Sequence, residues 1–200
     1  LGVTVVEGDP MLEKLTSEGD WRRAEAWLAS KLVPRTGIGF DVHAFAGHGP
    51  VTIGGIAVPH HRGLAGHSDA DVALHSITDA LLGAAALGDI GQHFPPSDPQ
   101  WRGADSSIFL AHAAAMVREL GGMIDGVDCT IICEVPKIGP YREAMRSRVA
   151  EILGIPRGSV SIKGTTTERL GFTGRGEGIA AQAIANVRMP ASDGPSERLS

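Results

Sequence analysis

The side chains that most readily bind a metal ion lie in two separate stretches of the sequence. Asp41 and His43 are two residues apart in an alternating segment, residues 36–43, so both project from one face of a predicted strand. His75 lies two turns into a predicted helix, where it can face the same cleft. One carboxylate and two imidazoles are ligands that zinc accepts, and three protein ligands with an open fourth position are typical of catalytic zinc. The alternative is an exposed strand face that carries two unrelated polar residues.

The helix predicted for residues 68–86 carries a polar stripe. Asp71, His75 and Asp79 recur at every fourth position, opposite a stripe of apolar side chains. A solvated helix face is the usual origin of such a stripe. A metal-ligand role for His75 is the sharper hypothesis, because the strand-borne aspartate and histidine lack a third ligand.

Two polar residues directly precede this helix. His67 and Ser68 lie where free backbone N–H groups and the helix dipole favour an anion. We therefore expect a phosphate group of a substrate to bind there, at the helix N-terminus. Asp89, just after the helix, is expected to orient a ligand or to bind a hydroxyl group.

A second polar segment, residues 163–178, is too rich in glycine and threonine for a core. Thr165, Thr166 and Thr167 offer hydroxyl and backbone N–H groups to phosphate oxygens. Glu168 follows them, and one carboxylate together with substrate phosphates is a common way of holding Mg²⁺. The segment matches neither a P-loop nor a dinucleotide-binding fingerprint. A connecting loop without function is the alternative.

The overall composition excludes several classes of partner. The 200 residues are 42% hydrophobic and 20% charged, with a net charge of −5 and no basic stripe. Nucleic acid and anionic membranes are therefore poor candidates, and no apolar run approaches membrane-spanning length. Cys129 and Cys133 are too far apart on an extended strand to form a disulfide. Two free thiols predict a reducing compartment, the bacterial cytoplasm.

The first 34 residues form a predicted unit of their own. A short strand at residues 3–6 precedes a helix that begins near Thr16 or Ser17. One strand and one helix cannot bury a core, so this segment must pack on another domain. The chain begins at Leu1 without an initiator Met, and we expect it to be part of a longer protein. The junction is predicted at residues 33–35.

The rest of the chain alternates between strands and helices. This order predicts an α/β sandwich, with a mixed four-stranded sheet covered by helices on one face. Residues 189–200 are predicted to form a disordered tail. The predicted elements are strands at 36–43, 127–135, 160–163 and 178–187, a Gly-Gly hairpin at 51–58, and helices at 68–86, 106–120 and from Pro140 to Gly154.

Four longer motifs resemble one known family, the 2-C-methyl-D-erythritol 2,4-cyclodiphosphate synthases. The resemblance extends over residues 35–187, with the motifs in order and compatibly spaced. The motifs are Gly-Phe-Asp-Val-His at 39–43, His-Ser-Asp-Ala-Asp-Val-Ala-Leu-His at 67–75, Asp-Ala-Leu-Leu-Gly-Ala-Ala-Ala-Leu-Gly-Asp-Ile-Gly at 79–91, and Thr-Thr-Thr-Glu-Arg-Leu-Gly-Phe-Thr-Gly-Arg-Gly-Glu-Gly at 165–178.

The resemblance implies a reaction and an assembly. Residues 35–188 would form a phosphorus–oxygen lyase that converts 4-diphosphocytidyl-2-C-methyl-D-erythritol 2-phosphate to 2-C-methyl-D-erythritol 2,4-cyclodiphosphate. CMP would be released, in the non-mevalonate route to isoprenoid precursors. The family also implies a homotrimer whose active sites lie between neighbouring subunits. A metal-dependent phosphohydrolase and a non-catalytic binder of isoprenoid diphosphates are the alternatives that share parts of this site.

The resemblance also assigns roles to individual residues. Asp41, His43 and His75 would hold one Zn²⁺ per subunit, and Glu168 would hold Mg²⁺ or Mn²⁺ with the substrate. His67 and Thr166 would stabilise the transition state. The implied substrate contacts are Asp41, His43, His67, Ser68, Asp89, Ile90, Gly91, Phe94, Asp98, Cys133, Pro136, Lys137, Ile138, Gly139, Thr165, Thr166, Thr167, Glu168, Phe172 and Arg175.

Two positions within this resemblance have further implications. Phe172 and Arg175 match positions that line the threefold cavity of the family, which can hold isoprenoid diphosphates. Pro96 stands where the family often has an acidic residue, and Asp98 is a candidate to replace the missing contact.

The first 32 residues resemble the C-terminal end of 2-C-methyl-D-erythritol 4-phosphate cytidylyltransferases. The similar stretches are Val-Val-Glu-Gly-Asp-Pro at residues 5–10, and Lys14, Asp20 and Ala24 with their neighbours. That enzyme acts earlier in the same pathway and is sometimes fused upstream of the cyclase. The resemblance therefore implies the C-terminal piece of a bifunctional enzyme.

Overall fold

The computed structural model describes residues 14–191, and the chain divides into two compact units between Leu32 and Val33. The first unit contains α1 (Glu18–Ser30). Ser17 and Asp20 cap it reciprocally, because each backbone N–H donates to the other side chain, at 2.8 and 3.2 Å. The predicted helix start is confirmed. The strand predicted at residues 3–6 lies outside the described residues.

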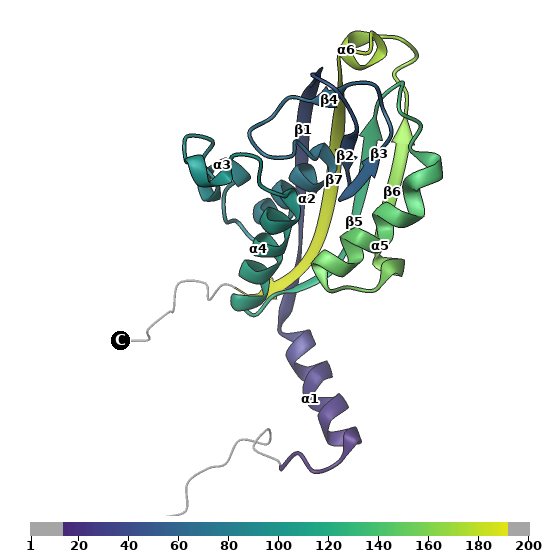
Figure 1. The fold of residues 1–200 in the computed structure, drawn as a ribbon. Helices are drawn as coiled ribbons and strands as arrows, with labels where there is room; N and C mark the ends of the chain where they lie inside the picture. Colours follow the sequence, from purple (N-terminus) through teal and green to yellow (C-terminus); the bar gives the residue numbers. More distant parts are fainter. Residues whose placement is uncertain (1–13, 192–200) are drawn as a thin grey trace, which may run out of the picture. The chain divides into compact units, whose positions relative to one another are not determined.

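The second unit is built on a mixed sheet, labelled in Figure 1. Its strands are ordered β4-β1-β7-β5-β6, with β5 parallel to β6 and antiparallel to β7. A separate hairpin pairs β2 with β3. The strands are β1 (Leu32–Ala46), β2 (Val51–Ile53), β3 (Ile56–Val58), β4 (Gly63–Leu64), β5 (Met123–Ile132), β6 (Val160–Thr165) and β7 (Gly178–Pro190).

The sheet has five strands, so the prediction of four was wrong. The additional strand is β4, whose two residues pair with Phe45 and Ala46 at the end of β1. A two-residue strand is too short to show any alternation of polar and apolar residues, which is why the sequence gives no sign of it. β7 also continues to Pro190, beyond the predicted end at residue 187, and residues 192–200 lie outside the described part.

Helices cover one face of this sheet (Figure 1). The three long ones are α2 (Val72–Ala84), α4 (Ser106–Glu119) and α5 (Arg142–Leu153), where the sequence predicts helices. The second unit also contains short helices, which are α3 (Ile90–His93), α6 (Gly171–Gly174), η1 (Pro99–Trp101), η2 (Gly139–Tyr141) and η3 (Arg157–Ser159). No helix among residues 14–191 has the length and apolar character needed to cross a bilayer.

The two faces of the sheet differ in their surroundings. Alternate residues of β5 and β7, such as Ile131 and Ala183, are completely buried beneath the helices. On the opposite face, Ile38, Phe40 and Val42 of β1 remain 39–63% exposed. The predicted alternation of β1 is therefore confirmed, but its apolar side chains face away from the helices.

Two glycines let α2 approach β1 closely. A Cβ atom on Gly37 would overlap the carbonyl oxygen of Ala80, and one on Gly39 would overlap that of Ser76. No other residue type fits this contact without moving the helix. The close approach brings the second turn of α2 directly over the strand that carries the predicted metal ligands.

The N-terminus of α2 is fixed by a buried carboxylate. Asp71 is fully buried and accepts hydrogen bonds from the backbone N–H groups of Ala73 and Leu74, at 3.1 and 3.0 Å. It also accepts from Gly54 and Gly55 at the tip of the β2–β3 hairpin, at 2.8 and 2.6 Å. One side chain therefore ties the hairpin to the helix, and Asp71 is not part of a solvated stripe.

Candidate active site

Three of the predicted metal ligands converge between β1 and α2. The Nε2 atom of His43 and the Nδ1 atom of His75 each lie 3.0 Å from Oδ2 of Asp41. The two imidazole nitrogens are 3.2 Å apart. Strand alternation places Asp41 and His43 side by side, and the close packing of α2 on β1 brings His75 to them.

The far side of the His43 ring is anchored by backbone. Its Nδ1 atom lies 2.7 Å from the carbonyl oxygen of Ala65. A carbonyl oxygen only accepts hydrogen bonds, so Nδ1–H donates to it. In the neutral ring Nε2, the nitrogen that faces Asp41, then keeps the lone pair that a metal ion requires; in the protonated ring it donates to Asp41 instead.

The cluster is electrostatically coupled. Burial opposes ionisation of Asp41, but hydrogen bonds from His43 and His75 outweigh this effect and hold the pKa of the carboxyl well below its ordinary value. Burial also opposes protonation of His43, yet the hydrogen bond and the charge of Asp41 raise the pKa of this imidazole above 6.5. Asp41 is thus ionised, and its carboxylate favours a positive charge at the cluster.

This donor set fits a divalent metal ion. One ligand atom from each of Asp41, His43 and His75 lies within 4.8 Å of the others, and within residues 14–191 no second such group of histidine, cysteine or acidic side chains is found. One oxygen and two nitrogen donors match zinc and other borderline metals. Side-chain exposures of 24%, 16% and 11% leave the cluster accessible from one side.

A cavity of about 180 Å³ opens beside the cluster. Its walls include the two histidine ligands, His67 and Ser68, and three aromatic rings that pack on one another at centroid distances of 4.5 to 5.7 Å. It therefore combines a polar, metal-binding wall with an apolar one. The lining residues are His43, His67, Ser68, His75, Ile90, Gly91, Phe94, Pro96, Trp101 and Phe109.

The structure corrects the reason given for an anion site at this cavity. The first N–H groups of α2 are already occupied, because the carboxylate of Asp71 accepts from them. His67 and Ser68 lie in the preceding loop and not at a free helix terminus. Two of the donors at the helix N-terminus, the N–H groups of Ala73 and Leu74, are thus already used, so a phosphate at this cavity would depend on the side chains of His67 and Ser68.

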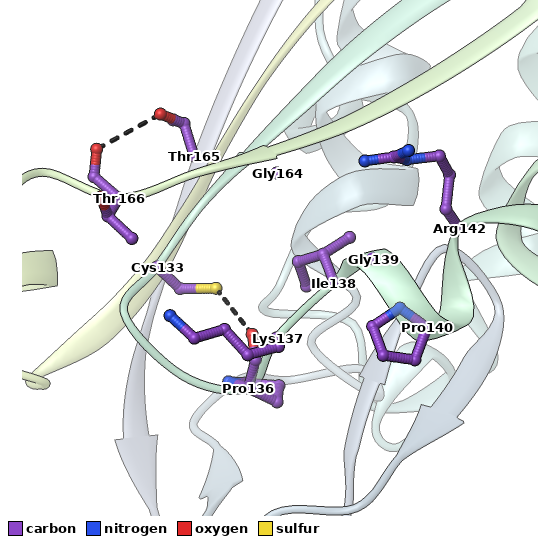
Figure 2. A pocket seen from close by; sticks show the side chains of 10 residues that line it. All are labelled: Cys133, Pro136, Lys137, Ile138, Gly139, Pro140, Arg142, Gly164, Thr165 and Thr166. Atoms are coloured by element: carbon purple, nitrogen blue, oxygen red, sulfur yellow. Dashed lines mark hydrogen bonds between the residues drawn. The ribbon is translucent and has the colours of Figure 1, made fainter.

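A larger cavity, about 500 Å³, lies where β5 and β6 end. Figure 2 shows Thr165 and Thr166 at one end of it and Arg142 at the other. It shares no lining residue with the smaller cavity. Seven of the expected substrate contacts line it: Cys133, Pro136, Lys137, Ile138, Gly139, Thr165 and Thr166. The other three lining residues, Pro140, Arg142 and Gly164, are not among the expected contacts.

Cys133 forms part of the wall of this larger cavity. Its thiol donates to the carbonyl oxygen of Pro136 at 3.4 Å (Figure 2). Burial raises its pKa to about 11, and that of Cys129 to about 12. Both cysteines are buried and free, so the prediction of two unpaired thiols is confirmed.

The loop after β6 is held by a residue that the sequence analysis missed. One carboxylate oxygen of Glu134 accepts the backbone N–H groups of Thr167 and Arg169, at 3.2 and 3.1 Å. Glu168 lies between these two residues and has a φ of 53°, while Arg169 has a φ of 64°. Both values fall in the left-handed region. The hydroxyl of Thr166 donates to Glu168 at 2.6 Å. Nothing in the local pattern around Glu134 indicates this partnership, which spans more than thirty residues.

The other predicted site residues lie outside both cavity linings. Asp89 and Asp98 accept backbone N–H groups and cap α3 and η1, at 2.9 and 3.0 Å. Arg175 pairs with Glu177 at 2.7 Å. Phe172, in α6, is 37% exposed. Thr167 hydrogen-bonds within its own loop, to Leu170 and Thr173.

The fold and the site together define an α/β protein with a candidate divalent-metal centre beside one of its cavities. The chain belongs to the YgbB family, whose sequence profile matches residues 34–188. This match confirms the resemblance that the four motifs indicate.

Three similar proteins illustrate the relationship. A bifunctional enzyme IspD/IspF of Rhizorhabdus wittichii is 60% identical over 190 residues, which is 95% of this chain and 49% of that protein. The bifunctional IspDF of Campylobacter jejuni superposes with a TM-score of 0.76 at 40% identity, covering 79% of this chain and 43% of that one. A 2C-methyl-D-erythritol-2,4-cyclodiphosphate synthase solved with CDP superposes with a TM-score of 0.71 at 33% identity, covering 76% and 99%. The chain thus spans about half the length of the curated relatives it matches.

Proposed function

We propose that this chain cyclises 4-diphosphocytidyl-2-C-methyl-D-erythritol 2-phosphate to 2-C-methyl-D-erythritol 2,4-cyclodiphosphate, with release of CMP. The observation that carries the proposal is the cluster of Asp41, His43 and His75 on the wall of a cavity. Membership of the YgbB family supports the choice of reaction. A neighbour solved with CDP supports a cytidine nucleotide as the bound group.

Two sets of residues would hold metal ions. Asp41, His43 and His75 would bind zinc, and Glu168 would bind magnesium or manganese together with the substrate. When bound, these cations neutralise charge on the diphosphate oxygens. The chain's own donors add to this: the side chains of His67 and Ser68 at the smaller cavity, and those of Lys137 and Thr166 at the larger one.

The chemical step is a phosphoryl transfer within one molecule. An oxygen of the 2-phosphate forms a bond to the β-phosphorus of the CDP group. The bond from that phosphorus to the bridging oxygen breaks, and the electron pair leaves with CMP. The protein has to hold two anionic groups in line, and well-oriented intramolecular reactions gain about 7–11 kcal/mol from such positioning. His67 and Thr166, which line the smaller and the larger cavity, would donate hydrogen bonds as charge shifts.

We propose that each site draws its two halves from neighbouring copies in a homotrimer. The metal centre and the larger cavity share no lining residue within one chain. An apolar strand face, Ile38, Phe40 and Val42, is available for subunit packing. Phe172 and Arg175 would face the threefold cavity and there contact an isoprenoid diphosphate.

We assign the two ends of the chain by the same comparison. Residues 1–34 would be the end of an upstream cytidylyltransferase domain, since the relatives are named IspD/IspF and are about twice as long. Residues 35–188 would be the cyclase domain. The longer protein would then carry two activities of one pathway.

Phosphorus NMR of the protein with the substrate, Zn²⁺ and Mg²⁺ tests the reaction. We expect equal amounts of CMP and a cyclic diphosphate, and neither from the His75→Ala variant. Linear phosphates would identify a hydrolase instead, and absence of turnover by zinc-loaded trimers would leave a non-catalytic binder.

Co-expression of two inactive variants tests the shared site. Chains with His75→Ala and chains with Glu168→Ala would each lack one half of the site. Mixed trimers should regain part of the activity, because one interface then combines two intact halves. No recovery in mixed trimers would place both halves in the same chain.

A further inference from the structure

We propose that Ser106 and Asp69 form a hydrogen-bonded relay that holds His75 in the tautomer and orientation required of a metal ligand. The proposal rests on the metal centre proposed above, but not on the cyclisation chemistry. Neither residue belongs to the expected contacts with substrate or metal. Both would act through His75, as positioning residues.

The two nitrogens of His75 face different partners. Nδ1 points into the cluster, 3.0 Å from Asp41 and 3.2 Å from His43. Nε2 points away from it, 2.8 Å from the hydroxyl of Ser106. A metal ion at the cluster therefore binds Nδ1, and the ring proton has to reside on Nε2.

The hydroxyl of Ser106 can satisfy this requirement because of its second partner. It donates to Oδ1 of Asp69, and a carboxylate only accepts. With its own proton committed to Asp69, the Ser106 oxygen presents a lone pair to His75. Nε2–H then donates to Ser106, and Nδ1 keeps its lone pair for the metal. The relay fixes the tautomer in the way that a carboxylate or carbonyl usually does for a metal-bound histidine.

A second hydroxyl also approaches Nε2, but it is less suited to this role. Ser68 lies 3.1 Å away, and its oxygen accepts the backbone N–H of Ala70 at 3.2 Å. It is partly exposed and lines the smaller cavity, whereas Ser106 is completely buried. Ser106 can therefore hold His75 while Ser68 stays available to a substrate phosphate.

The relay is braced by backbone on both sides. Oδ2 of Asp69 accepts the N–H of Ser106 at 3.2 Å, and Oδ1 accepts the N–H of Asp71 at 3.2 Å. The N–H of Asp69 donates to Ala104 at 3.0 Å. The carboxylate is thus fixed between the start of α2 and the start of α4, so it can hold Ser106 without moving. The negative charge of Asp69, acting through Ser106, also makes Nδ1 of His75 a stronger ligand for a metal ion.

Zinc affinity, measured by competition with a chromophoric chelator, tests the relay without any turnover. We expect Ser106→Ala and Asp69→Asn to weaken zinc binding about 10–100-fold, the usual cost of losing a partner of a metal-bound histidine. Ser107→Ala is the matched control, since it changes the neighbouring serine in the same helical turn, whose hydroxyl faces Asp105. Ser107→Ala should retain the wild-type zinc affinity. Equal affinities of Ser106→Ala and Ser107→Ala would overturn the proposal.

Nitrogen-15 NMR of the zinc-loaded wild-type protein gives a second test that needs no variant. We expect the His75 proton on Nε2, protected from exchange with solvent. A proton on Nδ1, or an Nε2–H that exchanges freely, would overturn the relay. If the protein binds zinc but does not cyclise the substrate, the proposed reaction is wrong, and the relay is still decided by these two measurements. Failure of the wild-type protein to bind zinc would overturn the metal centre and the relay together.

Discussion

At the candidate metal centre, ligand atoms from β1 and α2 lie 3.0 to 3.2 Å apart. The second ring nitrogen of each histidine also has a hydrogen-bond partner, Ala65 for His43 and Ser106 for His75. The larger cavity is constructed differently. It is lined by residues 136–140, which include two prolines and a glycine, and by the end of β6. The loop that follows β6 contains two non-glycine residues at positive φ, Glu168 and Arg169. The first site lies between a strand and a helix beside a cavity of about 180 Å³, whereas the second is a cavity of about 500 Å³ lined mainly by loop segments.

This difference indicates how each half of the proposed active site becomes ordered. The metal ligands are positioned by tight packing and by hydrogen bonds that exist before any ligand binds. At the larger cavity, where we propose that the nucleotide half of the substrate binds, the loop that follows β6 is instead held by hydrogen bonds to the single side chain of Glu134. We therefore expect substitutions of Asp41, His43 or His75 to abolish zinc binding, and substitutions of residues that line the larger cavity to weaken nucleotide binding without loss of zinc.

The largest effect is expected for the His43→Ala variant. It removes one of three metal ligands, so zinc binding should be lost and kcat/KM should fall about 10³-fold or more, since a metal ion stabilises transition-state charge by several kcal/mol. Lys137→Ala, at the larger cavity, should weaken CDP binding but leave zinc affinity unchanged. Zinc content by atomic absorption and CDP affinity by calorimetry check both. Loss of zinc from Lys137→Ala would contradict the separation of the two halves.

A pair of glycine substitutions tests the packing difference. Gly39→Ala places a Cβ against the carbonyl of Ser76 and should lower the free energy of unfolding by about 1–3 kcal/mol, with zinc affinity reduced as α2 moves from β1. A Cβ on Gly139, at the larger cavity, meets no atom within 4 Å. Gly139→Ala should therefore change stability by less than about 0.5 kcal/mol. Denaturant unfolding measures the free energy of unfolding of both variants. Equal losses of stability would show that the two sites do not differ in how closely they are packed.

The sequence predicts the element order well, because periodicity and caps are local signals. The hairpin at Gly54–Gly55, the end of α5 at Gly154 and the alternation in β1 all follow from patterns of a few residues. The missing strand, β4, has only two residues and offers no pattern. Local signals thus give the elements that are long enough to show a period.

Sequence reasoning reaches only part of the site. Asp41 and His43 could be paired from strand geometry, and His75 was added from its place on a helix. Asp69, Ser106 and Glu134 could not be found, since each acts on a partner that only the tertiary fold brings near. A pattern of residue types also does not show that Asp71 turns inward and accepts the N–H groups of Ala73 and Leu74. Phosphate binding at His67 and Ser68 stays a prediction.

Zinc affinity should also depend on pH, with a sign set by His43. Asp41 raises the pKa of His43 above 6.5 in the metal-free protein, so protonated His43 adds stability that is fully present below 6.5 and is lost as pH rises through the folded-state pKa. Zinc needs the neutral ring. Its affinity should therefore fall about tenfold per pH unit below that pKa and level off above it. Chelator competition between about pH 6 and 8 measures this slope, and a flat profile would show that His43 is not a ligand.

The smallest loss of activity is expected for a substitution of Glu134, which supports the loop after β6. Glu134→Ala leaves the N–H groups of Thr167 and Arg169 without their acceptor, and a typical net hydrogen bond contributes about 0.5–1.5 kcal/mol. The loop that carries Glu168 should loosen, because the left-handed backbone at residues 168 and 169 is itself costly. Apparent magnesium affinity in turnover should fall about three- to tenfold, while zinc affinity stays at the wild-type value. Glu134→Gln retains the accepting oxygen and should restore most of the loss. A parallel fall in zinc affinity would mean that the two halves are not supported independently, and the contrast between them would then fail.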